Sequence, residues 1–274
     1  MRKKHWILIT LAGLFIIGSV WVYRDNQRIV TTRYTLTFDR LPAAFDGFTI
    51  AQVSDLHNAE FGENNVRLLE ALREAAPDII VITGDMIDSR STDVEIAAAF
   101  AEAAVKIAPV YYVTGNHEER IPKDAALLEA RMTAAGVHVL HNACAVLSRG
   151  DDQIALLGLD HAGVVSGEGQ RLRARTDPSS FTVLLSHRPD LFYAYRDLGV
   201  DLVFSGHAHG GQFRIPLLGG IYAPNQGFSP KYTEGCHTSG NTTMVISRGL
   251  GNSLFPFRIN NPPELVVVTM HTAP

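Results

Sequence analysis

Five apolar segments of this 274-residue chain each end in a polar cluster whose side chains can bind a metal. These side chains are carboxylate, imidazole and amide groups, and none is a thiol. Such mixed oxygen and nitrogen ligands suit divalent Mn, Fe or Zn. They are too many for one tetrahedral ion and about enough for two ions that share a bridging ligand. The candidate ligands are Asp55, His57, Asp85, Asn116, His187, His207 and His209.

A pair of divalent ions has a defined chemistry. Two ions roughly 3.5–4 Å apart can hold the attacking and leaving oxygens of a phosphoryl centre and lower the pKa of a bound water. If Asp55 and Asp85 are the only anionic ligands, the site keeps a positive net charge. Such a site attracts an anionic phosphate. We therefore expect two divalent metal ions as cofactors and a phosphate ester or phosphoanhydride as substrate.

The elements that position these ligands can be read from the first half of the chain. Short β-rich runs alternate with helical stretches, which predicts β-α-β units and a parallel sheet. Asp85 lies 30 residues after Asp55, and Asn116 lies 31 residues after Asp85, about one such unit each. Parallel strands end at one edge of the sheet, where ligands of open α/β sheets bind. The runs are residues 50–53, 79–82 and 110–113, and the helices are expected around residues 66–72, 95–104 and 127–135, the last closed by Gly136.

The second half is expected to hold closely spaced strands with few helices. Gly, Asn and Pro dominate residues 206–240, which predicts mostly loop. A short helix is expected at residues 191–197. The strands are expected at residues 137–140, 143–147, 154–159, 181–185, 201–204, 242–247 and 265–270.

The motifs together resemble those of a known superfamily. Asp-x-His at 55–57, Gly-Asp-x-x-Asp at 84–88, Gly-Asn-His-Glu at 115–118, His187, and Gly-His-Ala-His at 206–209 occur in order. This set resembles the calcineurin-like metallophosphoesterase superfamily over about residues 48–270. Ser-His-Arg-Pro at 186–189 and Asn-Pro-Pro-Glu at 261–264 resemble its bacterial membrane-associated branch. The resemblance implies an α/β fold, a four-layer αββα sandwich of two mixed β-sheets flanked by helices.

The resemblance also implies roles. Asp55, His57, Asp85 and His209 would hold one ion, and Asp85, Asn116, His187 and His207 the other, with Asp85 as the bridge. His117 would be the catalytic residue that faces the substrate and protonates the leaving oxygen, while a metal-bridging hydroxide attacks phosphorus. Ala208 replaces a frequent Thr, and Asp160-His161 replaces a frequent Asp-Asp, which puts a substrate contact there in question. Asp88 is expected to orient its loop or a residue that supports the ligands, rather than to bind metal. Glu118 is expected either to support the ligands or to lie in solvent, and Arg188 to bind either phosphate or a neighbouring carboxylate.

The N-terminal segment predicts a membrane anchor. Residues 6–23 are 18 residues without a charge, about 27 Å as a helix, and they follow Arg2, Lys3 and Lys4. A cleaved signal peptide is the competing reading, but residues 20–23 are a poor cleavage context. We expect residues 1–27 to be an N-terminal transmembrane helix and residues 28–274 the metallophosphoesterase domain. We expect a single-pass protein of the cell membrane, and the basic leader favours a cytoplasmic N-terminus with the catalytic domain outside. Arg24, Arg28 and Arg33, which follow the apolar segment, favour the opposite orientation.

The amino-acid composition limits the classes of binding partner that we expect for this chain. The net charge of −4 provides no basic field, so no nucleic-acid partner is indicated. The two cysteines, Cys144 and Cys236, are read as free thiols, although a disulfide between them stays open. The apolar residues 217–222 and 254–257 either close the core, the favoured reading, or form an acyl-chain groove or membrane-contact patch.

The substrate and the function leave alternatives. The substrate is expected to be a simple phosphodiester, or a phosphoanhydride that includes membrane-associated or nucleotide-linked lipids. Relatives in the resembling branch include UDP-diacylglucosamine pyrophosphatases of envelope lipid synthesis. A non-catalytic, membrane-anchored binding module is the alternative of another class, but such proteins lose ligands and this chain has kept them all. A one-zinc peptidase is disfavoured because the sequence has no HExxH motif.

Overall fold

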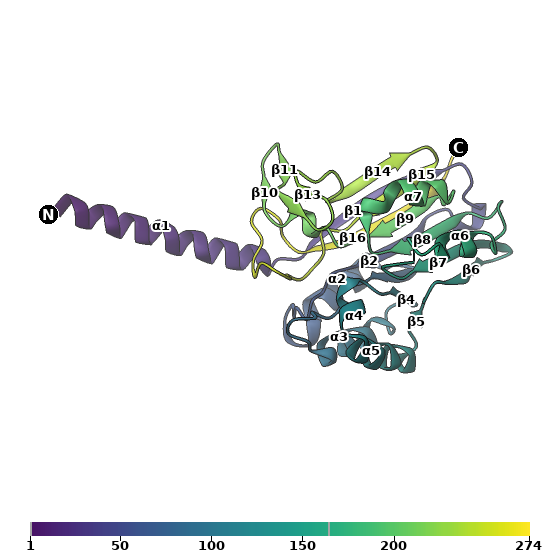
Figure 1. Ribbon diagram of the computed structural model, residues 1–274, viewed down its shortest axis with the longest axis horizontal. Helices are drawn as coiled ribbons and strands as arrows, with labels where there is room; N and C mark the ends of the chain where they lie inside the picture. Colours follow the sequence, from purple (N-terminus) through teal and green to yellow (C-terminus); the bar gives the residue numbers. More distant parts are fainter. Residues whose placement is uncertain (1, 164) are drawn as a thin grey trace.

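The computed structural model describes residues 2–163 and 165–274. Helix α1 (Arg2–Asn26) projects from an α/β domain as a long rod (Figure 1). The helices of the domain are short and lie mainly on its outer faces. They are α2 (Val66–Ala75), α3 (Val94–Ala104), α4 (Asn116–Arg120), α5 (Pro122–Ala135), α6 (Glu168–Arg173) and α7 (Phe192–Asp197).

Two mixed sheets form the centre of the described domain. The first, sheet A, contains in spatial order β1 (Val30–Phe38), β16 (Glu264–Thr272), β2 (Phe48–Val53), β3 (Ile79–Thr83), β4 (Val110–Val113) and β5 (His138–Val139). The second, sheet B, contains β14 (Gly235–Ser239), β15 (Thr242–Ile246), β9 (Leu202–Ser205), β8 (Thr182–Ser186), β7 (Asp152–Leu159) and β6 (Ala143–Arg149). Short hairpins are formed by β10 (Arg214–Ile215) with β11 (Gly219–Gly220), and by β12 (Tyr222–Ala223) with β13 (Gly227–Phe228).

The apolar pattern of the strands explains why the sheets pack face to face. Successive strand residues point to opposite faces. In β3, Val81 lies in the core between the sheets, whereas Ile80 and Ile82 pack against the helices outside sheet A. In β7, Leu156 points into the core between the sheets and Leu157 into the cluster under α6 and α7. The result is helix, sheet, sheet, helix, which confirms the expected four-layer sandwich.

The ends of the outer helices carry the expected signals. In α2, Leu68, Leu69 and Leu72 share the buried face, as their helical spacing predicts. Helix α5 has Pro122 at its first position and ends at Gly136, whose φ of 98° is the left-handed conformation that glycine adopts without strain.

The strand directions bring the ends of both sheets to one edge. Strands β2, β3 and β4 are mutually parallel, and so are β7, β8, β9 and β15. Each predicted strand is present, within a few residues of its expected bounds. The sequence reading missed β1, which pairs in parallel with β16, and also β14, which lies in the region predicted as loop.

Helix α1 has the composition of a membrane span. Among the described residues, Lys4–Asn26 is one helix long and apolar enough to cross a membrane, with mean hydropathy 2.1. None of its most apolar 18-residue window is buried in the structure. Both cysteines are free, as expected, since Cys144 lies in β6 and Cys236 in β14 on the opposite edge of sheet B.

Candidate metal centre

All seven candidate ligands lie beyond strand ends at the edge shared by the two sheets. Asp55 follows β2, Asp85 follows β3, and Asn116 follows β4 in sheet A. His187 follows β8, and both His207 and His209 follow β9 in sheet B. Every one of these side chains belongs to a residue that is at most 8% exposed. The structure therefore brings together groups that lie up to about 150 residues apart in the chain.

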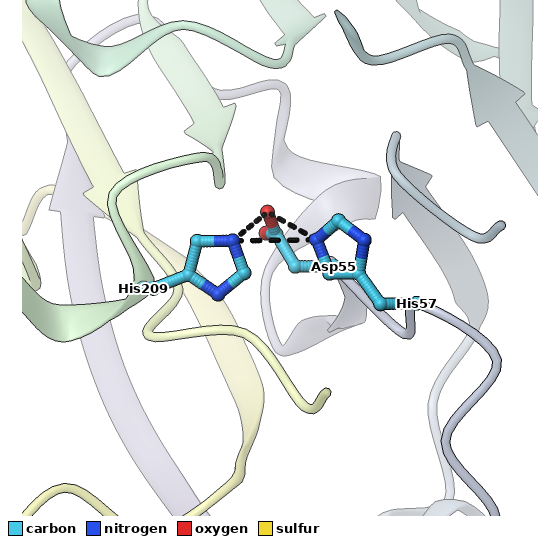
Figure 2. A group of neighbouring side chains, drawn as sticks. All are labelled: Asp55, His57 and His209. Atoms are coloured by element: carbon cyan, nitrogen blue, oxygen red, sulfur yellow. Dashed lines mark hydrogen bonds and ion pairs between the residues drawn. The ribbon is translucent and has the colours of Figure 1, made fainter. Parts of the chain in front are cut away.

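The first group of neighbouring ligands comprises Asp55, His57 and His209 (Figure 2). His209 Nε2 lies 3.4 Å from Asp55 Oδ1 and 3.3 Å from His57 Nε2. His57 Nε2 lies 3.9 Å from Asp55 Oδ1. Ligand atoms bound about 2.1 Å from one ion are separated by roughly 3.0–3.4 Å at ideal tetrahedral or octahedral angles. The two separations that involve His209 meet this spacing, and the longer His57–Asp55 separation corresponds to a wider angle at a shared cation.

The second group comprises Asp85, His187 and His207. His187 Nε2 lies 3.1 Å from Asp85 Oδ2 and 3.1 Å from His207 Nδ1. The other ring nitrogen of His187, Nδ1, donates to the backbone carbonyl of Thr83 at 2.6 Å. This bond fixes the ring so that Nε2 faces the other two ligand atoms.

Asp85 connects the two groups. Its Oδ2 lies 3.1 Å from His187 Nε2 and 3.6 Å from His57 Nε2. A single carboxylate therefore faces an imidazole of each group. Asp85 is also the residue for which the resemblance implies a bridging role.

Asn116 completes the second group. Its amide carbonyl oxygen faces His207 Nδ1 at 2.7 Å. Two lone pairs at this distance repel each other, whereas two ligands of one cation adopt this arrangement. The residues present therefore fit a pair of divalent cations in both their donor chemistry and their spacing.

Burial sets the protonation of the histidines. It lowers the pKa of His57 and of His207 well below the usual value, and it lowers the pKa of His209 to about 4. Neutral imidazoles are the form that binds metals. Burial also acts against a charged His187, but the Asp85 carboxylate outweighs it and raises the pKa of His187 to about 10. A cation that binds His187 Nε2 would therefore have to displace a proton from this ring.

The backbone at the site is strained. Asp55, His57, Asp85, His207 and His209 all have positive φ, between 46° and 67°. Residues other than glycine rarely adopt this conformation, and it concentrates at functional sites. Gly115 is required next to these turns, because a Cβ there would collide with the Asp85 side chain.

Glu118 holds the loop that carries Asp85. Its buried carboxylate accepts backbone N–H bonds from Asp85 at 2.9 Å, Met86 at 2.8 Å and Gly115 at 2.8 Å. Burial, followed by the nearby Asp85 carboxylate, raises the pKa of Glu118 to about 7. Glu118 is thus buried and holds the loop of the candidate ligand Asp85, the first of the two positions expected for it.

His117 is oriented by the loop after β3. Its Nδ1 accepts from the Ser89 N–H at 2.9 Å, and burial lowers the pKa of the ring. The neutral ring therefore carries its proton on Nε2, which lies 3.2 Å from Ser253 Oγ. His57, Asp88 and His117 also cluster, but Nδ1 of His117 is occupied by Ser89, so this cluster adds no further ligand set.

A cavity of about 370 Å³ opens in front of these residues. Arg90, Arg120 and His161 line it together with Asp85, His117 and the two histidines after β9. His161, where the departure from Asp-Asp had put a substrate contact in question, thus lines the cavity. Arg188 does not line the cavity and pairs with Asp190 at 2.5 Å, so the reading as a structural ion pair is correct.

Some contributors gave no signal in the sequence. Ser253 reaches His117 across 136 residues, and Asn225 Nδ2 lies 3.3 Å from His207 Nε2. Ser253 stands in the loop after β15 and Asn225 in the turn between β12 and β13, and neither belongs to a motif. Asp160 points away from the ligands and bonds instead to Asn142 at 2.9 Å and Thr114 at 3.2 Å.

Comparison with known proteins places the chain in a family. A family model described as calcineurin-like phosphoesterase matches residues 48–211. An uncharacterized metallophosphoesterase of Bacillus subtilis, YkuE, is 33% identical over 90% of this chain and 87% of its own length. Phosphodiesterase YaeI of Escherichia coli is 28% identical over 87% of each chain. A Bos taurus transmembrane protein with a metallophosphoesterase domain is 28% identical over 94% of this chain and 61% of its own. The chain therefore belongs to the calcineurin-like phosphoesterase family and is a phosphoester hydrolase.

Proposed function

We propose that this protein is a membrane-anchored hydrolase that uses two divalent ions to cleave phosphodiester or phosphoanhydride bonds. The observation that carries the proposal is the position of Asp85, whose Oδ2 faces His187 at 3.1 Å and His57 at 3.6 Å. One carboxylate between two imidazole groups is what a dinuclear centre needs and a single-ion centre does not.

The ligands divide into two sets that share Asp85. Asp55, His57 and His209 complete one set, and the remaining residues are Asn116, His187 and His207. Mn, Fe or Zn suits these oxygen and nitrogen donors. When bound, the ions neutralise phosphoryl oxygens and supply a water of lowered pKa as nucleophile.

His117 is the proposed general acid. Its Nε2 carries the proton and faces the cavity beside Ser253. Donation from Nε2 to the leaving oxygen would offset the charge that develops there as the bond to phosphorus breaks. Arg90 and Arg120 line the same cavity and would attract the phosphate before the reaction.

The class of bond is supported by the relatives. The Escherichia coli relative is named a phosphodiesterase, and the chain covers 87% of it. We extend the proposal to substrates in which the phosphate is attached to a lipid or to a nucleotide-linked lipid, as in the UDP-diacylglucosamine pyrophosphatases of the branch that the sequence motifs resemble. A non-catalytic binding module is disfavoured, because the complete ligand set is buried and spaced for cations.

The anchor is supported by α1 and by relatives described as transmembrane proteins. We propose a single span with the N-terminus in the cytoplasm and the domain outside, since Arg2, Lys3 and Lys4 precede the apolar segment.

Hydrolysis assays test the proposal. Full-length protein loaded with Mn²⁺ is expected to release p-nitrophenol from bis-p-nitrophenyl phosphate, and Asp85→Asn is expected to abolish the release. A parallel assay uses a UDP-linked glycolipid in detergent. Turnover of the soluble diester alone would contradict the extension to lipid substrates. Absence of turnover of both substrates, with partner binding retained in Asp85→Asn, would favour the binding module.

A further inference from the structure

A second, apolar cavity of about 800 Å³ lies between α1 and the domain, and we call it the anchor cavity. Its wall on the side of α1 includes Phe15, Gly18 and Trp21. The opposite wall includes Phe61 and Phe257. These five side chains are uncharged, and the one charged residue in the described lining, Glu60, is exposed. The cavity between the two walls therefore suits a hydrocarbon ligand.

Defined hydrogen bonds hold the two walls of the anchor cavity together. Asn26, the last residue of α1, donates from Nδ2 to the Arg258 carbonyl at 2.9 Å and accepts from the Arg258 N–H at 2.7 Å. Arg258 is 1% exposed, and its Nη1 donates to the Arg248 carbonyl at 2.6 Å. The end of α1 is therefore held by two partly buried hydrogen bonds to a backbone segment whose Arg258 side chain is buried in the domain.

One loop separates the anchor cavity from the catalytic cavity. Asn252, Pro256 and Phe257 of this loop line the anchor cavity. The residues between them, Ser253, Leu254 and Phe255, line the catalytic cavity. Ser253 Oγ also lies 3.2 Å from His117 Nε2. A ligand with its phosphate beside His117 therefore needs to pass only this loop to place an attached chain against α1.

The elements around the anchor cavity indicate where a hydrocarbon chain bound there would come from. The helix that forms one wall has the length and mean hydropathy of a membrane span. The hairpins around β10–β13 lie at the end of the domain from which α1 projects (Figure 1). Their Leu217, Leu218 and Phe228, together with Leu254, are each at least 69% exposed. These residues do not close the core, so the favoured reading of residues 217–222 and 254–257 is wrong for Leu217, Leu218 and Leu254.

We propose that the anchor cavity binds the hydrocarbon chain of a membrane lipid whose phosphodiester or phosphoanhydride occupies the catalytic cavity. This inference rests on the proposed function and specifies its substrate as an amphiphile taken from the bilayer that holds α1. The exposed apolar residues at this end of the domain would contact the same bilayer surface.

The test uses full-length, Mn²⁺-loaded protein in nanodiscs and two diesters with the same leaving group, p-nitrophenyl methyl phosphate and p-nitrophenyl octyl phosphate. Gly18→Trp places a bulky side chain at the wall of the anchor cavity, and a Cβ at Gly18 meets no atom within 4 Å. Gly13→Trp is the matched control, because Gly13 has equal space on the same helix and does not line the cavity. Because the octyl ester partitions into the bilayer equally with both variants, a difference between the two variants does not come from this partition.

The wild type and Gly13→Trp are expected to prefer the octyl ester by at least about tenfold in kcat/KM, since apolar burial strengthens with each methylene. Gly18→Trp is expected to lose most of this preference through a higher KM, with the methyl ester hydrolysed within about twofold of the wild-type rate. If Gly18→Trp and Gly13→Trp prefer the octyl ester equally and still cleave the methyl ester, the proposed binding of a hydrocarbon chain in the anchor cavity is overturned. The proposed function would then stay intact. If the wild type is a dimer that Gly18→Trp dissociates, and chain length has no effect on hydrolysis, the cavity would instead belong to an interface with a second copy of the chain. Loss of both activities in the wild type would contradict the proposed function itself.

Discussion

The carboxylate of Glu118 accepts a hydrogen bond from the backbone N–H of Asp85 at 2.9 Å. The same oxygen, Oε2, accepts from Gly115 at 2.8 Å, and Oε1 accepts from Met86 at 2.8 Å. Because both oxygens serve as acceptors, the side chain has no room for a donor. Asp85, the proposed shared ligand, is therefore positioned by a buried carboxylate that is not among the proposed ligands.

Glu118→Gln should weaken metal binding. One side of the Gln amide is an NH₂ group, which would face backbone N–H donors and leave them unpaired at a cost of about 1–3 kcal/mol. We expect a fall in metal affinity of about 10–100-fold, measured by titration with Mn²⁺. Glu119→Gln is the matched control, because Glu119 is exposed on the same helix, α4. Equal metal affinity in both variants would contradict the role given to Glu118.

His117→Ala should reduce catalysis without removing the metals. Its Nε2 faces the cavity and Ser253, and it is not among the proposed ligands. Loss of a general acid lowers kcat by about 10²–10⁴-fold. Kinetics on bis-p-nitrophenyl phosphate and metal analysis of the same sample check both statements. A variant that has lost its metals would show that His117 acts as a ligand or holds the site together.

Metal affinity should rise with pH. Before a metal binds, Asp85 raises the pKa of His187 to about 10, so the ring is protonated at neutral pH. His57, His207 and His209 have lowered pKa values and need lose no proton there. Binding is therefore expected to release about one proton, and the apparent affinity to rise about tenfold per pH unit between pH 6 and 9. Calorimetry in buffers of different ionisation enthalpy measures the proton. No release at pH 7 would contradict this assignment.

His141 should make stability depend on pH away from the metals. Partial burial opposes its charge, but Glu129 at 2.7 Å and Asp160 at 3.2 Å raise the pKa of the ring. A histidine whose pKa is raised in the folded state stabilises the fold fully at a pH below its unfolded pKa of about 6.5. This stabilisation is lost as the pH rises through the pKa of the folded state. His141→Gln should therefore lower the Tm by up to about 3 °C at pH 5.5 and less at pH 9. A larger loss at pH 9 would reverse the sign and contradict the ion pairs.

Much of the fold and of the site can be predicted from the sequence, because parallel strands place their carboxyl ends at the same edge of a sheet. Asp55, Asp85 and Asn116 each follow a buried apolar run at intervals of one β-α-β unit. That arrangement predicts both the sheet and the meeting of the ligands at one edge.

Other features depend on tertiary contacts that leave no local pattern. Strand β1 is only partly buried and is held by its pairing with β16 at the far end of the chain. Ser253 reaches His117 only because a loop after β15 folds over the site. The anchor cavity likewise requires the bonds between Asn26 and Arg258, which are 232 residues apart.

The central claim is that Asp85 is shared by two bound ions. The direct measurement is the metal content of full-length protein purified without chelators, by inductively coupled plasma mass spectrometry, for the wild type, Asp85→Asn and the exposed control Asp151→Asn. We expect about two Mn, Fe or Zn ions per chain in the wild type and in Asp151→Asn, and less than one in Asp85→Asn. Undiminished metal content in Asp85→Asn, or a wild type with no tightly held transition metal, would contradict the account.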